Sequence, residues 1–167
     1  MLRIEPLDRH QRSRFDCGED ALNIFLRTLA RQQQAKGISK TFVLVDSVKP
    51  KTIIGFFSLA ACEVMSENLP ATWAKKYPSK APGAKLARLA VDRKYQGKGY
   101  GQLLMIEAMQ KALLVAEQIG MIGFFVDAKD HAARTYYAQF GFISFQQEPL
   151  AMFLPLATLR QALVTQA

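Results

Sequence analysis

A glycine-rich hexapeptide, Gln96-Gly97-Lys98-Gly99-Tyr100-Gly101, is the part of the sequence most clearly suited to binding an anion. It follows an apolar run typical of a strand and opens the longest helical pattern in the chain. Glycines let the backbone approach an anion and adopt positive φ angles, and the N–H groups of a first helical turn attract negative charge. The hexapeptide therefore predicts a pyrophosphate cradle, with a ligand-free glycine turn as the alternative. Its spacing fits neither a Walker A loop nor the dinucleotide pattern Gly-x-Gly-x-x-Gly.

Positive charge gathers beside this hexapeptide. The chain has 22 Lys and Arg against 14 Asp and Glu, a net charge of +8. Residues 75–98 alone hold eight basic residues against Asp92, a net of +7. Such focusing raises the local concentration of anions and steers them inward. The segment predicts a polyanionic ligand, and a solvated basic face is the alternative.

The apolar patterns predict a mixed α/β domain that positions the hexapeptide between a strand and a helix. Leu22, Phe25, Leu26 and Leu29 have helical spacing, with Asp16 and Glu19 as a capping pair in front. Residues 66–84 contain three prolines and a glycine, which favours an irregular or partly helical excursion. The other expected elements are strands at 2–7, 41–45, 53–59, 86–91, 121–128, 142–145 and 151–154, and helices at 99–119 and 130–140, the latter with an acidic cap.

Length and composition limit the class of protein. With 167 residues, half of them apolar, the chain fits one domain spanning 1–167 with its own core. Its longest uncharged apolar run, residues 53–62, is half of the roughly 20 residues that a membrane span needs. Charges near the N-terminus exclude a signal peptide, and two cysteines are too few for a disulfide framework. We expect a cytoplasmic protein with no structural metal and no membrane contact.

The sequence also resembles a known family. Gln96-x-x-Gly99-x-Gly101 after Leu89-Ala90-Val91-Asp92 is similar to the acyl-CoA pyrophosphate motif of the GNAT superfamily of N-acyltransferases, and residues 132–142 resemble its closing helix–strand motif. Further segments resemble one branch, the TacT-like acetyltransferase toxins of bacterial type II toxin–antitoxin modules. These segments are 15–18, 26–27, 41–44, 55–59, 86–92 and 125–128.

This resemblance implies a fold and a function. The fold is the GNAT fold, a central mixed β-sheet flanked by helices. The implied activity is transfer of acetyl from acetyl-CoA to the α-amine of aminoacyl-tRNA, which blocks translation. A ribbon-helix-helix antitoxin is the implied partner and a homodimer the implied assembly. The apolar C-terminal run around Met152-Phe153-Leu154 is, as a hypothesis from the sequence, the candidate for its interface. Two alternatives stay open: a GNAT enzyme acting on a small-molecule or protein amine, and an acyl-CoA-binding module without catalysis.

The resemblance also assigns roles in acetyl-CoA binding and catalysis. The backbone of Leu89, Ala90 and Val91 pairs with the pantetheine arm, and an N–H there holds the thioester oxygen. Tyr137 matches the general acid that protonates the leaving thiolate. A core aromatic is the alternative for Tyr137, whereas Tyr136 is expected to pack. The residues expected to bind the CoA phosphates are Gln96, Gly97, Lys98, Gly99, Tyr100 and Gly101.

On the acceptor side, cations are expected to hold tRNA, and no side chain stands out as a base. Trp73 and Tyr77 are expected to pack against the core, with base stacking as the alternative. His10 and His131 are expected at the surface and Glu63 as a solvated carboxylate. An α-amine, with a pKa of about 7.7–8.0 before esterification lowers it, needs no strong base. The expected tRNA-binding residues are Lys75, Lys76, Lys80, Lys85, Arg88 and Arg93.

Overall fold

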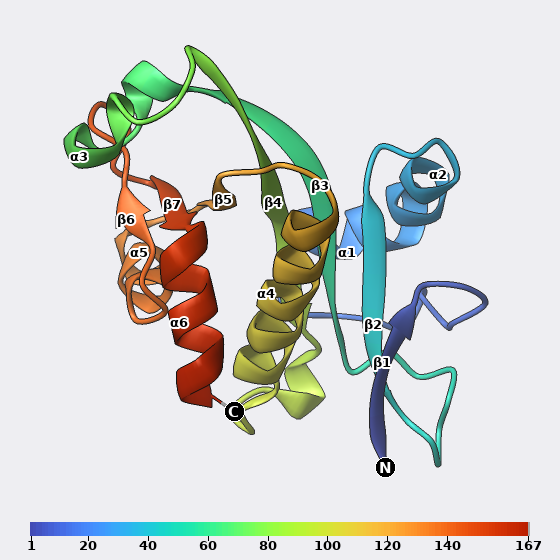
Figure 1. The fold of residues 1–167 in the computed structure, drawn as a ribbon. Coiled ribbons are helices and arrows are strands. Elements are labelled where there is room, and N and C mark those ends of the chain that lie inside the picture. Colours follow the sequence, from blue (N-terminus) through green and yellow to red (C-terminus); the bar gives the residue numbers. More distant parts are fainter. Residues whose placement is uncertain (167) are drawn as a thin grey trace. The chain divides into compact units, whose positions relative to one another are not determined.

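Seven strands form a mixed sheet in the order β1-β2-β3-β4-β5-β7-β6 (Figure 1). The computed structural model describes residues 1–166. Strands β4 and β5 are parallel, whereas β1–β2, β2–β3, β5–β7 and β6–β7 are antiparallel. The predicted mixed sheet with flanking helices is confirmed. The strands are β1 (Leu2–Pro6), β2 (Lys40–Asp46), β3 (Gly55–Met65), β4 (Lys80–Val91), β5 (Gly123–Asp127), β6 (Ile143–Ser144) and β7 (Ala151–Pro155).

Helical elements connect these strands. The one without a counterpart in the sequence prediction is the last, α6, which follows β7 directly. The helices are α1 (Asp20–Ile24), α2 (Ala30–Ala35), α3 (Ala71–Ala74), α4 (Tyr100–Gln118), α5 (His131–Ala138) and α6 (Leu156–Gln166). A π-helical segment η1 (Phe25–Leu29) joins α1 to α2, and two 3₁₀ turns are η2 (Ser66–Asn68) and η3 (Arg93–Tyr95).

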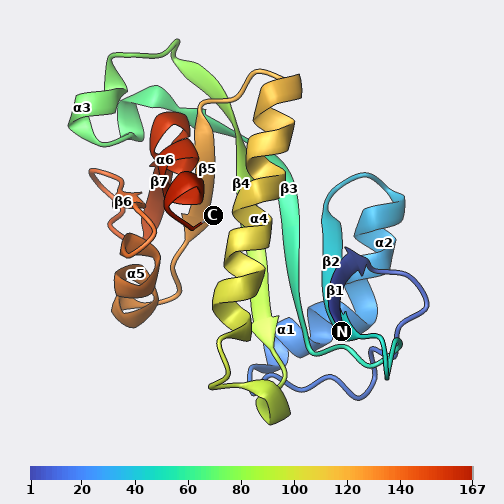
Figure 2. The same cartoon turned by 60° about the horizontal axis from the view of Figure 1, so that its bottom comes forward.

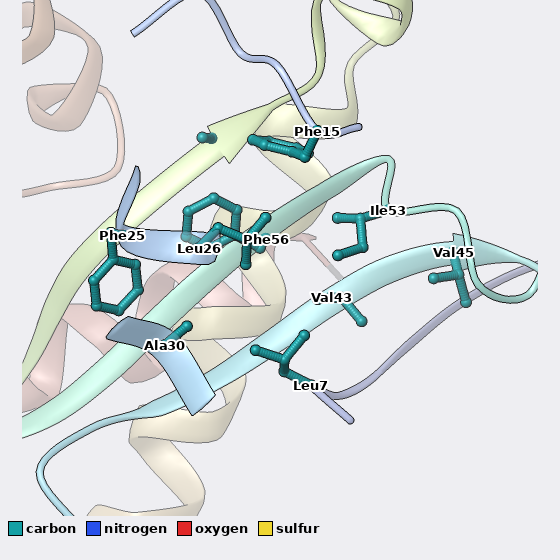
Figure 3. Close-up of a cluster of buried hydrophobic side chains, with 10 residues drawn as sticks. Leu7, Phe15, Phe25, Leu26, Ala30, Val43, Val45, Ile53 and Phe56 are labelled. Atoms are coloured by element: carbon teal, nitrogen blue, oxygen red, sulfur yellow. The ribbon is translucent and has the colours of Figure 1, made fainter. Parts of the chain in front are cut away.

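The chain divides into two compact units, and the first comprises residues 1–60 and 87–108. Its core lies between the α1–η1–α2 segment and the strands. Figure 3 shows Phe25, Leu26 and Ala30 of the helical segment in the same cluster as Val43 and Phe56. The Phe25 and Phe56 rings stack with centroids 6.2 Å apart. This packing fixes the helical segment on β2 and β3.

The second unit comprises residues 61–86 and the chain from residue 109 onward. Within it β4 pairs with β5 through Ala84, Lys85 and Leu86. Its core contains Phe125 and Phe153, whose rings stack with centroids 5.0 Å apart. The run Met152-Phe153-Leu154 is at most 2% exposed, because β7 lies between β5 and β6. The expectation that this run forms a dimer interface is therefore wrong.

The first helical segment begins later and turns differently than its sequence predicts. The helix starts at Asp20, so Asp16 is too far upstream to cap it; its Oδ1 accepts from the Gly18 N–H and the Asn23 amide instead. The predicted capping pair is wrong. The π-turn η1 adds a residue per turn relative to an α-helix, and Ala30 is fully buried whereas Leu29 is 41% exposed. The apolar face therefore continues through Ala30.

Strand β4 begins inside the predicted excursion, at Lys80. Pro82 has no N–H to donate, yet its carbonyl accepts from the Ile122 N–H at 2.9 Å. The ring of Phe125 occupies the space that a Cβ at Gly83 needs. A proline and a glycine that are typical of a turn thus belong to an extended strand. Glycine is needed there because the Phe125 side chain of β5 lies close to the β4 backbone. The rest of the excursion is helical in part, as η2 and α3, which confirms that prediction.

Candidate functional site

The turn after β4 is anchored by a buried carboxylate. Asp92 is 7% exposed, and its Oδ1 accepts from the Lys94 N–H at 2.9 Å, which caps η3. Its Oδ2 accepts from the Asp16 N–H at 3.0 Å. Its own N–H donates to the Ile54 carbonyl at 2.9 Å. Asp92 therefore fixes the direction in which the chain leaves β4. Figure 2 shows the chain turning from the end of β4 into α4.

Two glycines with positive φ shape the hexapeptide itself. Gly97 has φ +78° and Gly99 has φ +84°, and within residues 1–166 a Cβ at either would meet no atom within 4 Å. The demand for glycine at both positions is thus conformational. Helix α4 begins directly afterwards at Tyr100, so N–H groups of its first turn have no partner within the helix. This arrangement suits a pyrophosphate, as the sequence predicts.

Gln96 braces the turn through its side chain. Its Nε2 donates to the Val91 carbonyl at 2.8 Å and to the Cys17 carbonyl at 3.1 Å. We therefore assign the amide group of Gln96 to positioning, because its donors are engaged by the protein. Lys98 is exposed, with its Nζ 5.8 Å from the Tyr95 ring centroid.

Leu89, Ala90 and Val91 form the last residues of β4. The hydrogen-bonded register with β5 covers Ala84 to Leu86, so β4 continues beyond this pairing. Ala90 is buried in the first core and the two flanking side chains are half-buried, which follows strand alternation. The backbone of residues 89–91 is thus in extended form directly before the turn.

A cavity that sequence reasoning missed borders the hexapeptide. It has a volume of about 290 Å³ and its lining includes Tyr95, Tyr100, Lys49 and Thr52. The two tyrosine rings lie 6.4 Å apart between centroids. Lys49 and Thr52 come from the β2–β3 hairpin, and nothing in the sequence pattern links that hairpin to the turn.

Tyr137 lies in α5, within the second unit. Asp130 caps this helix, its Oδ1 accepting from the Ala133 N–H at 2.8 Å, which confirms the predicted acidic cap. The half-buried Tyr137 ring makes edge contacts with Tyr136 at 5.6 Å and Phe142 at 5.8 Å. Burial raises the pKa of Tyr136, which also contacts Phe140 at 5.3 Å. Both rings are therefore held in place by their neighbours.

The six expected tRNA-binding cations differ in their surroundings. Lys75 and Lys80 are exposed. Lys85 forms an ion pair of 2.6 Å with Asp127, and the Arg93 guanidinium lies 3.9 Å from Asp16. The other two stand over aromatic rings, Lys76 at 4.3 Å from Trp73 and Arg88 at 3.7 Å from Phe25. Four of the six belong to the second unit, and Arg88 and Arg93 to the first.

The aromatic residues of the basic segment pack as expected. Trp73 makes an edge contact of 5.8 Å with Phe153, and Tyr77 packs against the same core. Burial raises the pKa of Tyr77.

One expectation about the histidines is wrong. The His10 side chain is only 7% exposed, because its Nε2 lies 3.0 Å from Glu5 and its Nδ1 accepts from the Asp8 N–H at 3.1 Å. This hydrogen bond from His10 lowers the pKa of Glu5. His131 and Glu63 are exposed, as predicted.

Two negative findings apply to residues 1–166. No helix there has both the length and the apolar character that crossing a bilayer requires. No three His, Cys, Asp or Glu residues in this range come together in a group able to hold a metal ion.

Comparison with known proteins places this geometry in a family. A model of the acetyltransferase (GNAT) domain matches residues 37–144. The chain is 33% identical over 140 residues to a tRNA-acetylating toxin of Mycobacterium tuberculosis, covering 84% of this chain and 82% of the relative. It is 29% identical over 168 residues to a probable toxin TacT of Sinorhizobium fredii, covering 94% and 92%.

Solved structures agree. AtaT in complex with acetyl-methionyl-tRNAfMet is 32% identical with a TM-score of 0.88, covering 96% of this chain and 98% of that one. A tyrosine-to-phenylalanine mutant of KacT is 30% identical with a TM-score of 0.89 and the same coverage. A tyrosine-to-phenylalanine mutant of AtaT bound to the C-terminus of the antitoxin AtaR and acetyl-CoA is 30% identical with a TM-score of 0.81, covering 96% of each chain. The chain therefore belongs to the GNAT acetyltransferase family, in which it is similar to tRNA-acetylating toxins.

Proposed function

We propose that this protein transfers acetyl from acetyl-CoA to the α-amine of aminoacyl-tRNA and thereby blocks translation. The observation that carries the proposal is the glycine turn fixed to the end of β4, with φ +78° at Gly97 and +84° at Gly99. In the reaction the α-amine nitrogen attacks the thioester carbonyl carbon. The C–S bond then breaks, the amine loses a proton, and the CoA thiolate gains one.

The first unit supplies the groups for acetyl-CoA. Amides of residues 97–101 bind the pyrophosphate, and Lys98 neutralises CoA phosphate charge. The extended backbone of Leu89, Ala90 and Val91 pairs with the pantetheine arm. A main-chain N–H in this stretch holds the thioester oxygen, where negative charge develops in the transition state.

Tyr137 supplies the proton for the leaving thiolate. A phenol is a suitable acid for this step, because it is protonated at neutral pH and becomes a better donor as charge develops on sulfur. Two observations support this assignment: the ring is fixed by Tyr136 and Phe142, and two similar toxins were solved as tyrosine-to-phenylalanine mutants.

Two arguments support an aminoacyl-tRNA as the acceptor: the positive charge of the chain and the acid–base chemistry of the amine. The concentration of cations in residues 75–98 suits a polyanion. An esterified amino acid presents an amine that is largely unprotonated near neutral pH, so no dedicated base is needed. This agrees with the contacts of His10, whose ring nitrogens are engaged by Glu5 and Asp8.

Further proposals concern assembly and location. We propose that residues 1–167 act as one domain, in the cytoplasm, where charged tRNA is found. A ribbon-helix-helix antitoxin neutralises the enzyme. The chain forms a homodimer, which is supported by exposed apolar side chains of the second unit, Leu114, Val115, Ile119 and Val164. A solution mass of 18.7 kDa, that of one chain, would refute the dimer.

The decisive experiment offers labelled acetyl-CoA to three acceptors: aminoacylated tRNA, deacylated tRNA and a lysine-rich peptide. We expect label on charged tRNA alone, released together with the amino acid by mild alkali. Label on the peptide would instead indicate an enzyme for protein amines. Label on none of them would indicate a binding module.

A further inference from the structure

Arg88 has an unusual environment for a cation. Its guanidinium carbon lies 3.7 Å from the Phe25 ring centroid, and its side chain is half-buried. Among residues 1–166 the Arg88 guanidinium has no side-chain hydrogen bond or ion pair. Burial lowers the pKa of this guanidinium, which remains charged at neutral pH. By contrast, Lys85 on the same strand has Asp127 as its partner. Desolvating a cation without a carboxylate is costly, so Arg88 is poised for an external anion.

The aromatic support of Arg88 is rigid. Phe25 is 2% exposed and stacks on Phe56, which makes an edge contact of 5.4 Å with Phe15. The π-turn that begins at Phe25 is held by Arg12, whose Nη1 donates to the Arg27 carbonyl at 2.9 Å. One face of the guanidinium is therefore covered by a fixed ring. Its in-plane N–H donors remain, and this planar fork matches two oxygens of a phosphate or carboxylate.

Arg88 also has a defined place relative to the end of β4 that is proposed to hold acetyl-CoA. It directly precedes Leu89, the first of the three residues proposed to hold the acetyl-CoA arm, so the inference rests on the proposed function. In aminoacyl-tRNA the amino-acid carboxylate is esterified and carries no charge. The anion nearest to the α-amine is then the phosphate that joins the terminal nucleoside to its neighbour, one ribose away from the ester.

We propose that Arg88 binds this terminal phosphodiester through two parallel hydrogen bonds and so positions the α-amine for attack. Arg88 thereby differs from exposed cations such as Lys75, which attract the polyanion without fixing one group. Phe25 orients the guanidinium, so Arg88 loses less side-chain entropy when it binds the phosphate.

A pair of small acceptors isolates the phosphate. Both are 3′-aminoacylamido-3′-deoxyadenosines with a free α-amine and a stable amide link, and only one has a 5′-monophosphate. Wild type, Arg88→Gln, Arg88→Lys and the control Arg160→Gln, an exposed arginine outside the proposed site, are compared by kcat and KM for each acceptor. Acetyl-CoA affinity and thermal unfolding confirm that each variant is folded.

We expect the wild type and Arg160→Gln to favour the phosphorylated acceptor by about tenfold in kcat/KM, since charge-assisted pairs are strong. Arg88→Gln should abolish this preference by lowering kcat/KM for the phosphorylated acceptor. Arg88→Lys should restore little, because an ammonium lacks the planar fork. A preference retained in Arg88→Gln, or absent from the wild type, overturns the assignment while acetylation itself stands.

Charged tRNA provides the second measurement, which decides if neither small acceptor is used. Arg88→Gln should then raise KM for charged tRNA about tenfold, against less than threefold for Lys75→Gln. Equal effects of the two variants overturn the proposal. A wild-type enzyme that acetylates no charged tRNA refutes the proposed function instead.

Discussion

The side-chain amide of Gln96 donates to the carbonyl oxygen of Val91 at 2.8 Å and so joins the glycine turn to the strand from which it emerges. Since the same nitrogen also donates to the Cys17 carbonyl, one side chain ties the turn to β4 and to the loop before α1. Gln96 thus stabilises the shape of the proposed pyrophosphate site through protein contacts, and its side chain need not touch the ligand.

Replacing Gln96 by alanine should therefore weaken acetyl-CoA binding without removing a ligand contact. Losing two hydrogen bonds at an exposed position should lower the free energy of unfolding by about 1 kcal/mol. Calorimetric titration with acetyl-CoA and urea unfolding measure the two effects. Gln110→Ala, an exposed change within α4, is the control. Equal acetyl-CoA affinity in both variants would show that the brace has no role in binding.

Gly99→Ala should impair acetyl-CoA binding more severely. At φ +84° a Cβ strains the backbone by about 1–2 kcal/mol, so the turn shifts toward another conformation. The matched control is Gly120→Ala, where φ is not positive and a Cβ meets no described atom within 4 Å. If both substitutions leave the Kd for acetyl-CoA unchanged, the positive φ is irrelevant to binding.

Tyr137→Phe should reduce kcat about a hundredfold or more at unchanged acetyl-CoA affinity, since it removes the proposed general acid but keeps the ring contacts. The control is Tyr136→Phe, because Tyr136 precedes Tyr137 in α5 and packs against Phe140. Single-turnover acetylation of charged tRNA measures the chemical step directly. A larger loss in Tyr136→Phe would reassign the acid to that residue.

Lys80→Gln should reduce the salt dependence of charged-tRNA acetylation more than Lys85→Gln. An exposed cation that neutralises a phosphate contributes about 0.7–0.9 to the slope of log(kcat/KM) against log salt. Lys85 is already paired with Asp127 at 2.6 Å, so its removal frees a carboxylate and releases fewer counterions. Identical slopes for the two variants would argue against this difference.

Stability at low pH should depend on Glu5. The hydrogen bond from His10 lowers its pKa below the ordinary 4.5, so its contribution is complete above that pH and is lost as pH falls through the folded-state value. Glu5→Gln should thus be less stable than wild type at pH 7, by about 1 kcal/mol or less. The difference should shrink at pH 3.5. Urea unfolding at both pH values tests this; a constant difference would contradict it.

Much of the fold could be predicted because the relevant signals are local. The β-rich run in β2, the acidic cap at Asp130 and the glycines around Lys98 each determine structure through residues a few positions apart. The same holds for the chemistry, since a glycine turn between a strand and a helix is readable without tertiary contacts.

The errors arose where side-chain contacts or helix geometry that hydrophobic periodicity does not reveal determine the structure. The extra residue in the π-turn moves the buried face from Leu29 to Ala30, and the Arg12 contact that holds the turn is invisible to periodicity. His10 is buried because Glu5 on β1 reaches its ring. The orientation of Arg88 likewise depends on Phe25, which is 63 positions away in the sequence.

Gly83 gives the basic segment an unexpected constraint. Because the Phe125 ring fills the space beside it, even the smallest side chain there would push β4 away from β5. The exposed lysines around it, Lys80 among them, can change with little effect on folding. During divergence this stretch can therefore alter its charge, and with it the choice of polyanion, while its backbone stays the same. Gly83 is therefore a fixed position in a segment whose exposed lysines tolerate substitution.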